Sequence, residues 1–233
     1  MAQKVNISNS ISKTILFEKK SNTVYYEYCD KLELDNNSMV TIKGAKFKLA
    51  AINNYILNYL ISYNISTNYI GIIKRNTLSF EKFELLPVCI KVINTVNKRI
   101  AKIFNLVEGT SIPFPVYEIY LVSDKNNLIT ESHLISLNIC SVNDIKSITR
   151  IASKVNAVLK VFFERRNIVL NEMFCYFGKN EDKYFVVDDF TPLSLKVTPI
   201  HQNILKFNTS RIIKETHMNE YLEFFYNLIT TNK

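Results

Sequence analysis

Glycine is scarce in this 233-residue chain, which contains only Gly44, Gly71, Gly109 and Gly178, and tryptophan is absent. Phosphate-binding P-loops and dinucleotide-binding turns need clustered glycines, because only glycine lets the backbone approach a phosphate closely. Four isolated glycines exclude both designs. Any nucleotide site in this chain must therefore be built in another way.

Cysteine pairs and long apolar runs are also missing. The cysteines Cys29, Cys89, Cys140 and Cys175 stand far apart, whereas zinc sites and redox pairs need two cysteines close in sequence. We therefore expect reduced, buried thiols. No run reaches the roughly 18 apolar residues of a membrane helix, and the polar start lacks the apolar core of a signal peptide. These features predict a cytoplasmic protein with a loose Ser/Asn-rich tail over residues 1–12.

The formal charge of +8 would suit an anionic partner such as nucleic acid. The lysines, however, are spread along the whole chain with acidic residues between them, so they do not form the clustered footprint that nucleic-acid binding needs. Abundant Asn, Ile and Lys beside scarce Arg is also the composition that an AT-rich genome produces. Nucleic-acid binding is therefore the least favoured function.

The residue pattern predicts an α+β fold. Apolar residues alternate over residues 13–34, as in a hairpin followed by a third strand, and recur at intervals of three and four over residues 47–63 and 144–166, as in amphipathic helices. Residues 168–190 have the pattern of a strand, a turn and a second strand. Further elements are expected as strands at 69–74, 78–83, 85–93 and, after a Pro113/Pro115 breaker, 116–122, and as a helix around 221–228.

A series of short motifs runs through the chain in a fixed order. The first is LFEKKSNTVY at Leu16–Tyr25, and the last is DDFTP at Asp188–Pro192. Between them stand Ile52-Asn53-Asn54, Ile65-Ser66-Thr67, Leu86-Pro87-Val88, Asn94, Glu108-Gly109, His133-Leu134, Asn156-x-x-Leu159-x-x-Phe162-Phe163 and Phe177-Gly178. In this collinear order the motifs resemble those of the SAICAR synthetase family, and the resemblance covers roughly residues 13–229.

The resemblance implies a two-lobed fold. Its N-terminal nucleotide lobe, residues 13–86, would hold an antiparallel sheet with a helix, and its C-terminal substrate lobe, residues 87–233, would be an ATP-grasp-like α+β lobe. The family joins the amine of aspartate to the carboxylate of carboxyaminoimidazole ribotide at the expense of ATP, with magnesium neutralising phosphate oxygens. The resemblance thus implies ATP and magnesium as cofactors and small nucleotides as partners, and it leaves a homo-oligomer open.

The resemblance also assigns candidate site residues. Lys20 and Lys82 would bind the nucleotide, and Asp188 would bind the metal. Asn94, Arg99 and Lys196 would bind the substrate, and no catalytic residue is assigned. Two of these assignments have structural alternatives: Lys20 as a solvated hairpin lysine, and Asp188 as a hydrogen-bonded turn carboxylate.

Several positions depart from the family pattern. Where the family has a glutamate and an arginine on the central strand, this chain has Cys89 and Ile93. The family's motif Asp-Phe-Lys-Leu-Glu is replaced over residues 172–176, so that its lysine is Phe174 and its glutamate is Tyr176. Period-two alternation places positions 172, 174 and 176 on one face of the strand. A polar wall is therefore expected to have become largely aromatic.

Three functions follow from these observations. The chain could be a SAICAR synthetase-like protein of purine biosynthesis whose ligase activity is impaired by the replaced residues, or a strongly diverged but active enzyme. Alternatively it could be a non-catalytic paralogue, a pseudoenzyme that acts as a binding or regulatory partner. The third function, a nucleic-acid-binding module, ranks last for the reasons of charge distribution given above.

Overall fold

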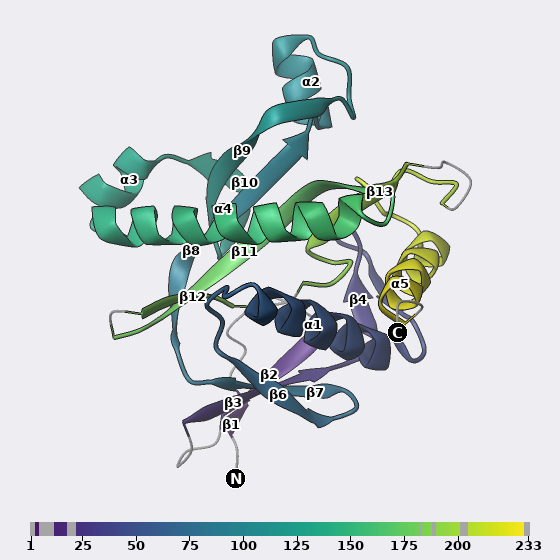
Figure 1. Ribbon diagram of the computed structural model, residues 1–233, viewed down its shortest axis with the longest axis horizontal. Helices are drawn as coiled ribbons and strands as arrows, with labels where there is room; N and C mark the ends of the chain where they lie inside the picture. The colour runs from purple at the N-terminus through teal and green to yellow at the C-terminus, as the bar shows by residue number, and fades with distance from the viewer. Residues whose placement is uncertain are drawn as a thin grey trace. The chain divides into compact units, whose positions relative to one another are not determined.

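The computed structural model describes residues 3–4, 12–17, 22–181, 183–187, 190–200 and 205–230 (Figure 1). The helices are α1 Ala45–Ser62, α2 Lys98–Phe104, α3 Glu131–Ser136, α4 Val142–Glu164 and α5 Glu215–Thr230. The strands are β1 Gln3–Lys4, β2 Lys13–Phe17, β3 Thr23–Tyr28, β4 Lys31–Glu33, β5 Met39–Thr41, β6 Tyr69–Lys74, β7 Thr77–Glu81, β8 Glu84–Thr95, β9 Ser111–Leu121, β10 Asp124–Ile129, β11 Ile168–Asn180, β12 Lys183–Val187 and β13 Leu195–Pro199.

The chain divides into two compact units. Unit 1 comprises Met1–Phe83, Asp189–Leu193 and Leu205–Lys233, and unit 2 comprises Glu84–Asp188 and Ser194–Ile204. In the part of the chain that the structure describes, no helix is long and apolar enough to cross a membrane.

Unit 1 is built on an antiparallel sheet with the strand order β1-β2-β3-β7-β6. Every second side chain of β3 is buried, as the alternating sequence predicts. α1 buries its apolar stripe, which includes Leu49, Ile56 and Leu60, and packs beside α5 (Figure 1). The predicted hairpin and the first predicted helix are confirmed. The strand β1 pairs with β2 and lies inside the tail over residues 1–12 that the sequence predicts to be loose.

Asn53 connects distant parts of unit 1. Its side chain is fully buried, and its amide nitrogen donates to the hydroxyl of Tyr28 at 2.8 Å. Its amide oxygen accepts the backbone N–H of Phe190 at 2.9 Å. A buried amide needs such partners, since an unsatisfied one costs about 1 to 3 kcal/mol. The segment around Phe190 thus belongs to unit 1, and α5 belongs to it through its packing against α1. The division into lobes at residues 13–86 and 87–233 stays a prediction.

Unit 2 contains a sheet with the strand order β10-β9-β8-β11-β12, and β13 pairs with β11. One face of this sheet is apolar and is covered by α4, whose buried side chains include Ile148, Val155 and Leu159 (Figure 1). The predicted long helix and the predicted strand-turn-strand are confirmed as α4 and the β11–β12 hairpin. The observed α4 begins at Val142, two residues earlier than predicted, with Ser141 as its N-cap.

The proline-rich segment before residue 116 does not break the chain's strand structure. Pro113 and Pro115 lie inside β9, although the sequence predicts a breaker there. The register between β8 and β9 shifts between Ile93 and Thr95, whose partners are Val116 and Ser111. Both prolines therefore fall in a bulge, where the missing N–H is not required for a ladder hydrogen bond.

The N-terminus of α4 is attached to the β11–β12 hairpin through Asp144. Ser141 and Asp144 form a capping box, in which the Ser141 hydroxyl and backbone N–H donate to the Asp144 carboxylate at 2.6 and 2.7 Å. The same carboxylate accepts from the Tyr184 hydroxyl at 2.6 Å and pairs with Lys179 at 3.4 Å. One side chain thus caps the helix and joins it to the sheet.

The stability of the protein should depend on the charge of Asp144. Burial raises the pKa of this carboxyl, but hydrogen bonds from Ser141 and Tyr184 outweigh that effect and lower the pKa from 3.8 to about 2. A carboxyl with a lowered folded-state pKa stabilises the fold above its unfolded pKa, and this contribution is lost as the pH falls from about 4 towards 2. We expect Asp144→Asn to lower the free energy of unfolding by about 1 to 2 kcal/mol at pH 7.

Urea denaturation at pH 7 and pH 3 measures this difference. The free energy of unfolding should differ less between pH 7 and pH 3 in Asp144→Asn than in the unmodified protein. In Glu164→Gln, at the exposed C-terminal end of α4, this difference should be the same as in the unmodified protein. An unchanged difference in Asp144→Asn would show that the Asp144 charge does not stabilise the fold.

Candidate functional site

One face of the unit 2 sheet gathers charged and aromatic side chains. In the register of the sheet, Phe174 lies opposite Lys91 and Lys91 opposite Glu118. In the next row on the same face, Tyr176 lies opposite Cys89 and Cys89 opposite Tyr120. We call this surface the polar face, and it comprises Cys89, Lys91, Glu118, Tyr120, Glu172, Phe174 and Tyr176. The other face of the sheet is the apolar one under α4.

Glu118 is a buried charge at the centre of β9. Its side chain is only 4% exposed, and it forms an ion pair with the guanidinium of Arg99 from α2. The hydroxyl of Tyr120 donates to its second oxygen at 2.6 Å. Burial raises the pKa of Tyr120, and Arg99 offsets only part of this rise, so Tyr120 remains a neutral donor. A buried carboxylate needs these partners, since removing a partner of a buried ion pair costs several kcal/mol.

Glu172 on β11 is held in a second polar cluster. One of its carboxylate oxygens pairs with the Lys91 ammonium at 2.7 Å, and the other accepts from the Asn97 amide at 2.6 Å. The Asn97 oxygen in turn accepts from the backbone N–H of Ile100 at 3.0 Å and caps α2. Both oxygens of Glu172 are thus engaged, and α2 is tied to the sheet by this cluster and by Arg99.

Two lysines lie over the aromatic rings of the polar face. The Lys91 ammonium is 5.7 Å from the centre of the Phe174 ring. The Lys125 ammonium, from β10, is 5.8 Å from the Phe174 ring and 4.8 Å from the Tyr176 ring. The two rings stack at 6.4 Å, and Tyr120 lies 6.1 Å from Phe174. Planar rings beside ammonium groups can accept a flat heterocycle that carries an anionic group.

Cys89 occupies the row of Tyr176 and Tyr120. It is fully buried, and burial raises the pKa of its thiol to about 11, with the Lys125 ammonium lowering it in part. A thiol with this pKa is protonated at neutral pH, so it is neither a nucleophile nor a ligand for a hard metal ion.

All three predicted substrate residues lie in unit 2. Arg99 contacts the polar face through Glu118, and Lys196 stands opposite Glu172 in the pairing of β13 with β11. Asn94 points to the other face, where its amide exchanges hydrogen bonds of 2.8 and 3.0 Å with Asn156 of α4. The structure thus brings Arg99 and Lys196 to the edge of the polar face and places Asn94 under α4. Substrate binding by these residues stays a prediction.

Three predicted site residues remain, one in unit 1 and two outside the described residues. Lys82 is exposed directly after β7 in unit 1, and its backbone N–H donates to the carbonyl of Asn22 at 2.8 Å. Lys20 and Asp188, the predicted phosphate and metal residues, lie outside the described residues. Their roles stay predictions.

Sequence reasoning missed Lys91, Glu118 and Lys125. Lys91 and Glu118 are single charges inside otherwise apolar strands, VCIKVIN and VYEIYL, and a buried strand rarely holds a charge without a partner. That signal could have identified both. Lys125 could not have been found in this way, because its approach to the rings depends on the irregular pairing of β10 with β9.

Comparison with known proteins decides the family. The family model of SAICAR synthetase matches residues 3–211 of this chain. The chain belongs to the SAICAR synthetase family. The phosphoribosylaminoimidazole-succinocarboxamide synthase of Pyrococcus furiosus is 30% identical over 204 residues, which cover 86% of this chain and 87% of that protein. The synthase of Wigglesworthia glossinidia brevipalpis is 28% identical over 186 residues, which cover 79% of this chain and 73% of that protein.

Solved structures agree on the fold. A SAICAR synthetase in complex with ADP has a TM-score of 0.82 at 24% identity, covering 100% of this chain and 99% of that one. The synthase of Ehrlichia chaffeensis has a TM-score of 0.81 at 18% identity, covering 97% and 98%. The α+β fold predicted from the resemblance to SAICAR synthetase is confirmed.

The polar face does not fit the magnesium ion that the SAICAR synthetase resemblance implies. Magnesium in proteins prefers carboxylate oxygens, whereas the positions expected to carry the family's glutamates hold the neutral thiol of Cys89 and the phenol of Tyr176. The carboxylate of Glu172 is occupied by Lys91 and Asn97. Within the described ranges, no three His, Cys, Asp or Glu side chains lie together as a metal cluster.

The four cysteines should differ in reactivity. Cys89, Cys140 and Cys175 are buried, and burial raises the pKa of each, whereas Cys29 is half-buried. We expect a thiol reagent at pH 8 to label Cys29 in the folded protein and the other three only after unfolding. Mass spectrometry after timed labelling measures this order. Rapid labelling of Cys89 in the folded protein would contradict its assignment as a neutral thiol, and Cys29→Ser should remove the fast phase.

Proposed function

We propose that this chain acts in purine biosynthesis as a ribotide-binding member of the SAICAR synthetase family, with impaired ligation of aspartate. The observation that carries the proposal is the composition of the polar face, where Cys89, Phe174 and Tyr176 replace residues whose charges serve the family's chemistry. A cytoplasmic location and a homo-oligomer remain predictions alongside it.

Ribotide binding is supported by the chemistry of the polar face. The half-buried ring of Phe174 offers a stacking surface for a planar imidazole, with the mostly buried ring of Tyr176 beside it. Such a contact contributes about 0.5 to 1.5 kcal/mol. The ammonium groups of Lys91 and Lys125 lie over these rings, where they can approach a carboxylate or phosphate. The SAICAR synthase of Saccharomyces cerevisiae has been solved with SAICAR, and this chain shares that fold with a TM-score of 0.78.

Impaired ligation is supported by the lost charges. The family reaction activates a carboxylate as an acyl phosphate, and the charge that develops must be stabilised by groups already in place. Removing one such group costs about 10²- to 10³-fold in kcat. Position 174 lacks the family's lysine and position 176 lacks its glutamate, while the remaining carboxylate, Glu172, is engaged with Lys91. These losses do not add independently, because the groups act as a unit.

A specific observation favours a second candidate, an active ligase with relocated charges. The family's cation is absent from position 174, yet Lys91 and Lys125 bring two ammonium groups over the Phe174 ring from neighbouring strands. If Lys125 performed the lost lysine's role, the chain would turn over at an ordinary enzymatic rate, on the order of 1 per second or more. Lys125→Met would then abolish that turnover.

A turnover assay separates the two candidates. Phosphate release from ATP is measured with aspartate and carboxyaminoimidazole ribotide, beside the Pyrococcus furiosus relative assayed in the same way. We expect kcat at least about 10³-fold below that of the relative, which corresponds to the loss of at least one charged group. A rate near 1 per second would exclude impairment and support the relocated charges.

A variant that restores the missing charges tests whether their loss impairs ligation. The variant Phe174→Lys with Tyr176→Glu returns the family's residue types, and Lys125 lies close enough to ring 176 to pair with the new carboxylate. We expect it to raise turnover above the unmodified protein, whereas Phe174→Met with Tyr176→Gln, which is similar in size but uncharged, should not. Circular dichroism and a melting curve must accompany both, since buried charges can destabilise the sheet.

A further inference from the structure

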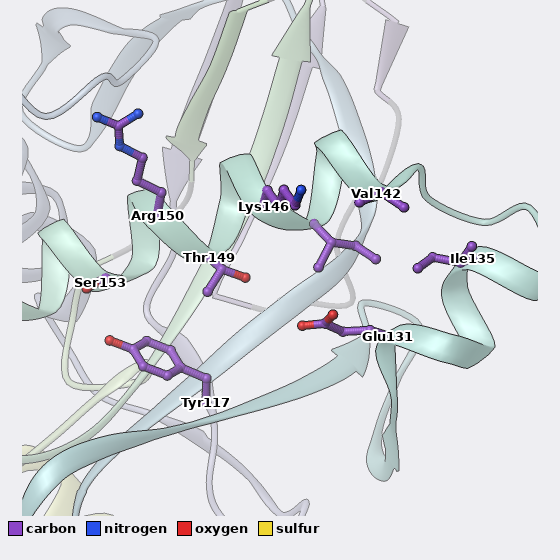
Figure 2. A pocket seen from close by; sticks show the side chains of 9 residues that line it. Tyr117, Glu131, Ile135, Val142, Lys146, Thr149, Arg150 and Ser153 are labelled. Atoms are coloured by element: carbon purple, nitrogen blue, oxygen red, sulfur yellow. The ribbon is translucent and has the colours of Figure 1, made fainter.

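A hollow in unit 2 lies away from the polar face. It is a cavity of about 410 Å³ between β9, α3 and α4 (Figure 2). Tyr117 lines it, whereas the next residue of β9, Glu118, belongs to the polar face. Because successive side chains of a strand point to opposite faces, the cavity and the candidate site are separated by the sheet. Its volume lies in the range of small-molecule sites, about 300 to 1,000 Å³.

One end of the cavity is apolar. Ile145 of α4 forms a buried floor at 3% exposure, and Ile135 of α3 and Val142 of α4 stand beside it at 39% and 46% exposure. Aliphatic side chains that are left this exposed beside a hollow gain free energy when a ligand removes them from water, at about 25 cal/mol per Å². This end therefore suits a branched aliphatic or aromatic group.

The other lining groups are polar and available. Figure 2 shows Glu131, Tyr117 and Thr149 directed into the space between α4 and the elements beneath it, and Ser153 continues the same stripe of α4. Among the residues that the structure describes, none of these four side chains has a hydrogen-bond or ion-pair partner. A ligand can thus bind to them without breaking a contact of the protein.

The lining carries charges of both signs on different elements. Glu131 belongs to α3, whereas Lys146 and Arg150 stand four residues apart on α4 and so share one side of that helix. Neither cation has an ion-pair partner within the described ranges. A simple carboxylic acid would meet the like charge of Glu131, and a simple amine would meet those of Lys146 and Arg150. A ligand that carries both charges can place its positive group at Glu131 and its negative group at Lys146 and Arg150.

We propose that this cavity binds a small zwitterion with an apolar side chain, of which a free aliphatic or aromatic amino acid is the simplest example. The ammonium group lies at Glu131 with the hydroxyls of Tyr117 and Thr149 as further acceptors. The carboxylate lies beside α4, where Lys146 and Arg150 belong to the lining. The Arg150 side chain, which Figure 2 shows directed away from Tyr117 and Glu131, turns toward the carboxylate when the ligand binds. The side chain occupies the apolar end at Ile145. This site is independent of the proposed function of the polar face.

Calorimetric titration of the full chain, without nucleotide or metal, tests the proposal. The ligands are L-leucine and L-phenylalanine, together with 3-methylbutylamine, which lacks the carboxylate of leucine, and 4-methylpentanoate, which lacks its ammonium group. We expect at least one amino acid to bind with a Kd of about 1 mM or below. Each leucine analogue should bind at least about tenfold more weakly than leucine, since each loses a charged contact. If neither amino acid binds, or an analogue binds as tightly as leucine, the proposal is wrong.

Variants locate the site. Glu131→Gln and Arg150→Gln should each weaken binding by about fivefold or more, and Ser153→Trp, which fills the cavity from an exposed position, should abolish it. Lys154→Gln, on the same helix but outside the lining, serves as the matched control and should bind like the unmodified chain. Binding that survives unchanged in Glu131→Gln and Ser153→Trp would overturn the assignment to this cavity, and circular dichroism checks that each variant is folded.

Discussion

The buried carboxylate of Glu118 is the constraint on which the polar face depends. A charge in the middle of a sheet is tolerated only when it is paired and hydrogen-bonded, and Glu118 obtains both from Arg99 and Tyr120. Arg99 must therefore lie near β9, which fixes α2 against the sheet. The Asn97 cap of α2 then reaches Glu172, and Glu172 holds Lys91. One buried charge thus organises two polar clusters and the helix that links them.

The same pairing explains how the polar face is stable without the charges that the resemblance assigns to positions 174 and 176. The sheet retains internal ion pairs, so it does not need a bound metal or nucleotide to neutralise it. Phe174 and Tyr176 fill the space that the resemblance assigns to a lysine and a glutamate, and Lys91 and Lys125 return positive charge from the neighbouring strands. These side chains support the proposal that the polar face binds a flat anion.

The sequence predicts most of the fold, because periodicity reports which side of an element is buried. Alternation identifies the β2–β3 and β11–β12 hairpins, and spacing identifies α1 and α4. The association of α5 with α1 could not be predicted, because it depends on contacts such as that between Lys48 and Glu223, 175 positions apart. In the site, alternation correctly groups Glu172, Phe174 and Tyr176, but the cations over their rings come from other strands, whose register depends on bulges in the sheet.

If the polar face binds the ribotide without a metal ion, calorimetry in the presence of EDTA should detect that binding. Carboxyaminoimidazole ribotide is titrated into the unmodified chain, into Lys125→Met, and into Lys154→Met, which removes an exposed lysine of α4 on the other side of the sheet. We expect binding with a Kd below about 1 mM, the upper end of usual KM values, weakened at least about fivefold in Lys125→Met and unchanged in Lys154→Met. Binding that appears only when magnesium is added, or that is indifferent to Lys125, would contradict this expectation.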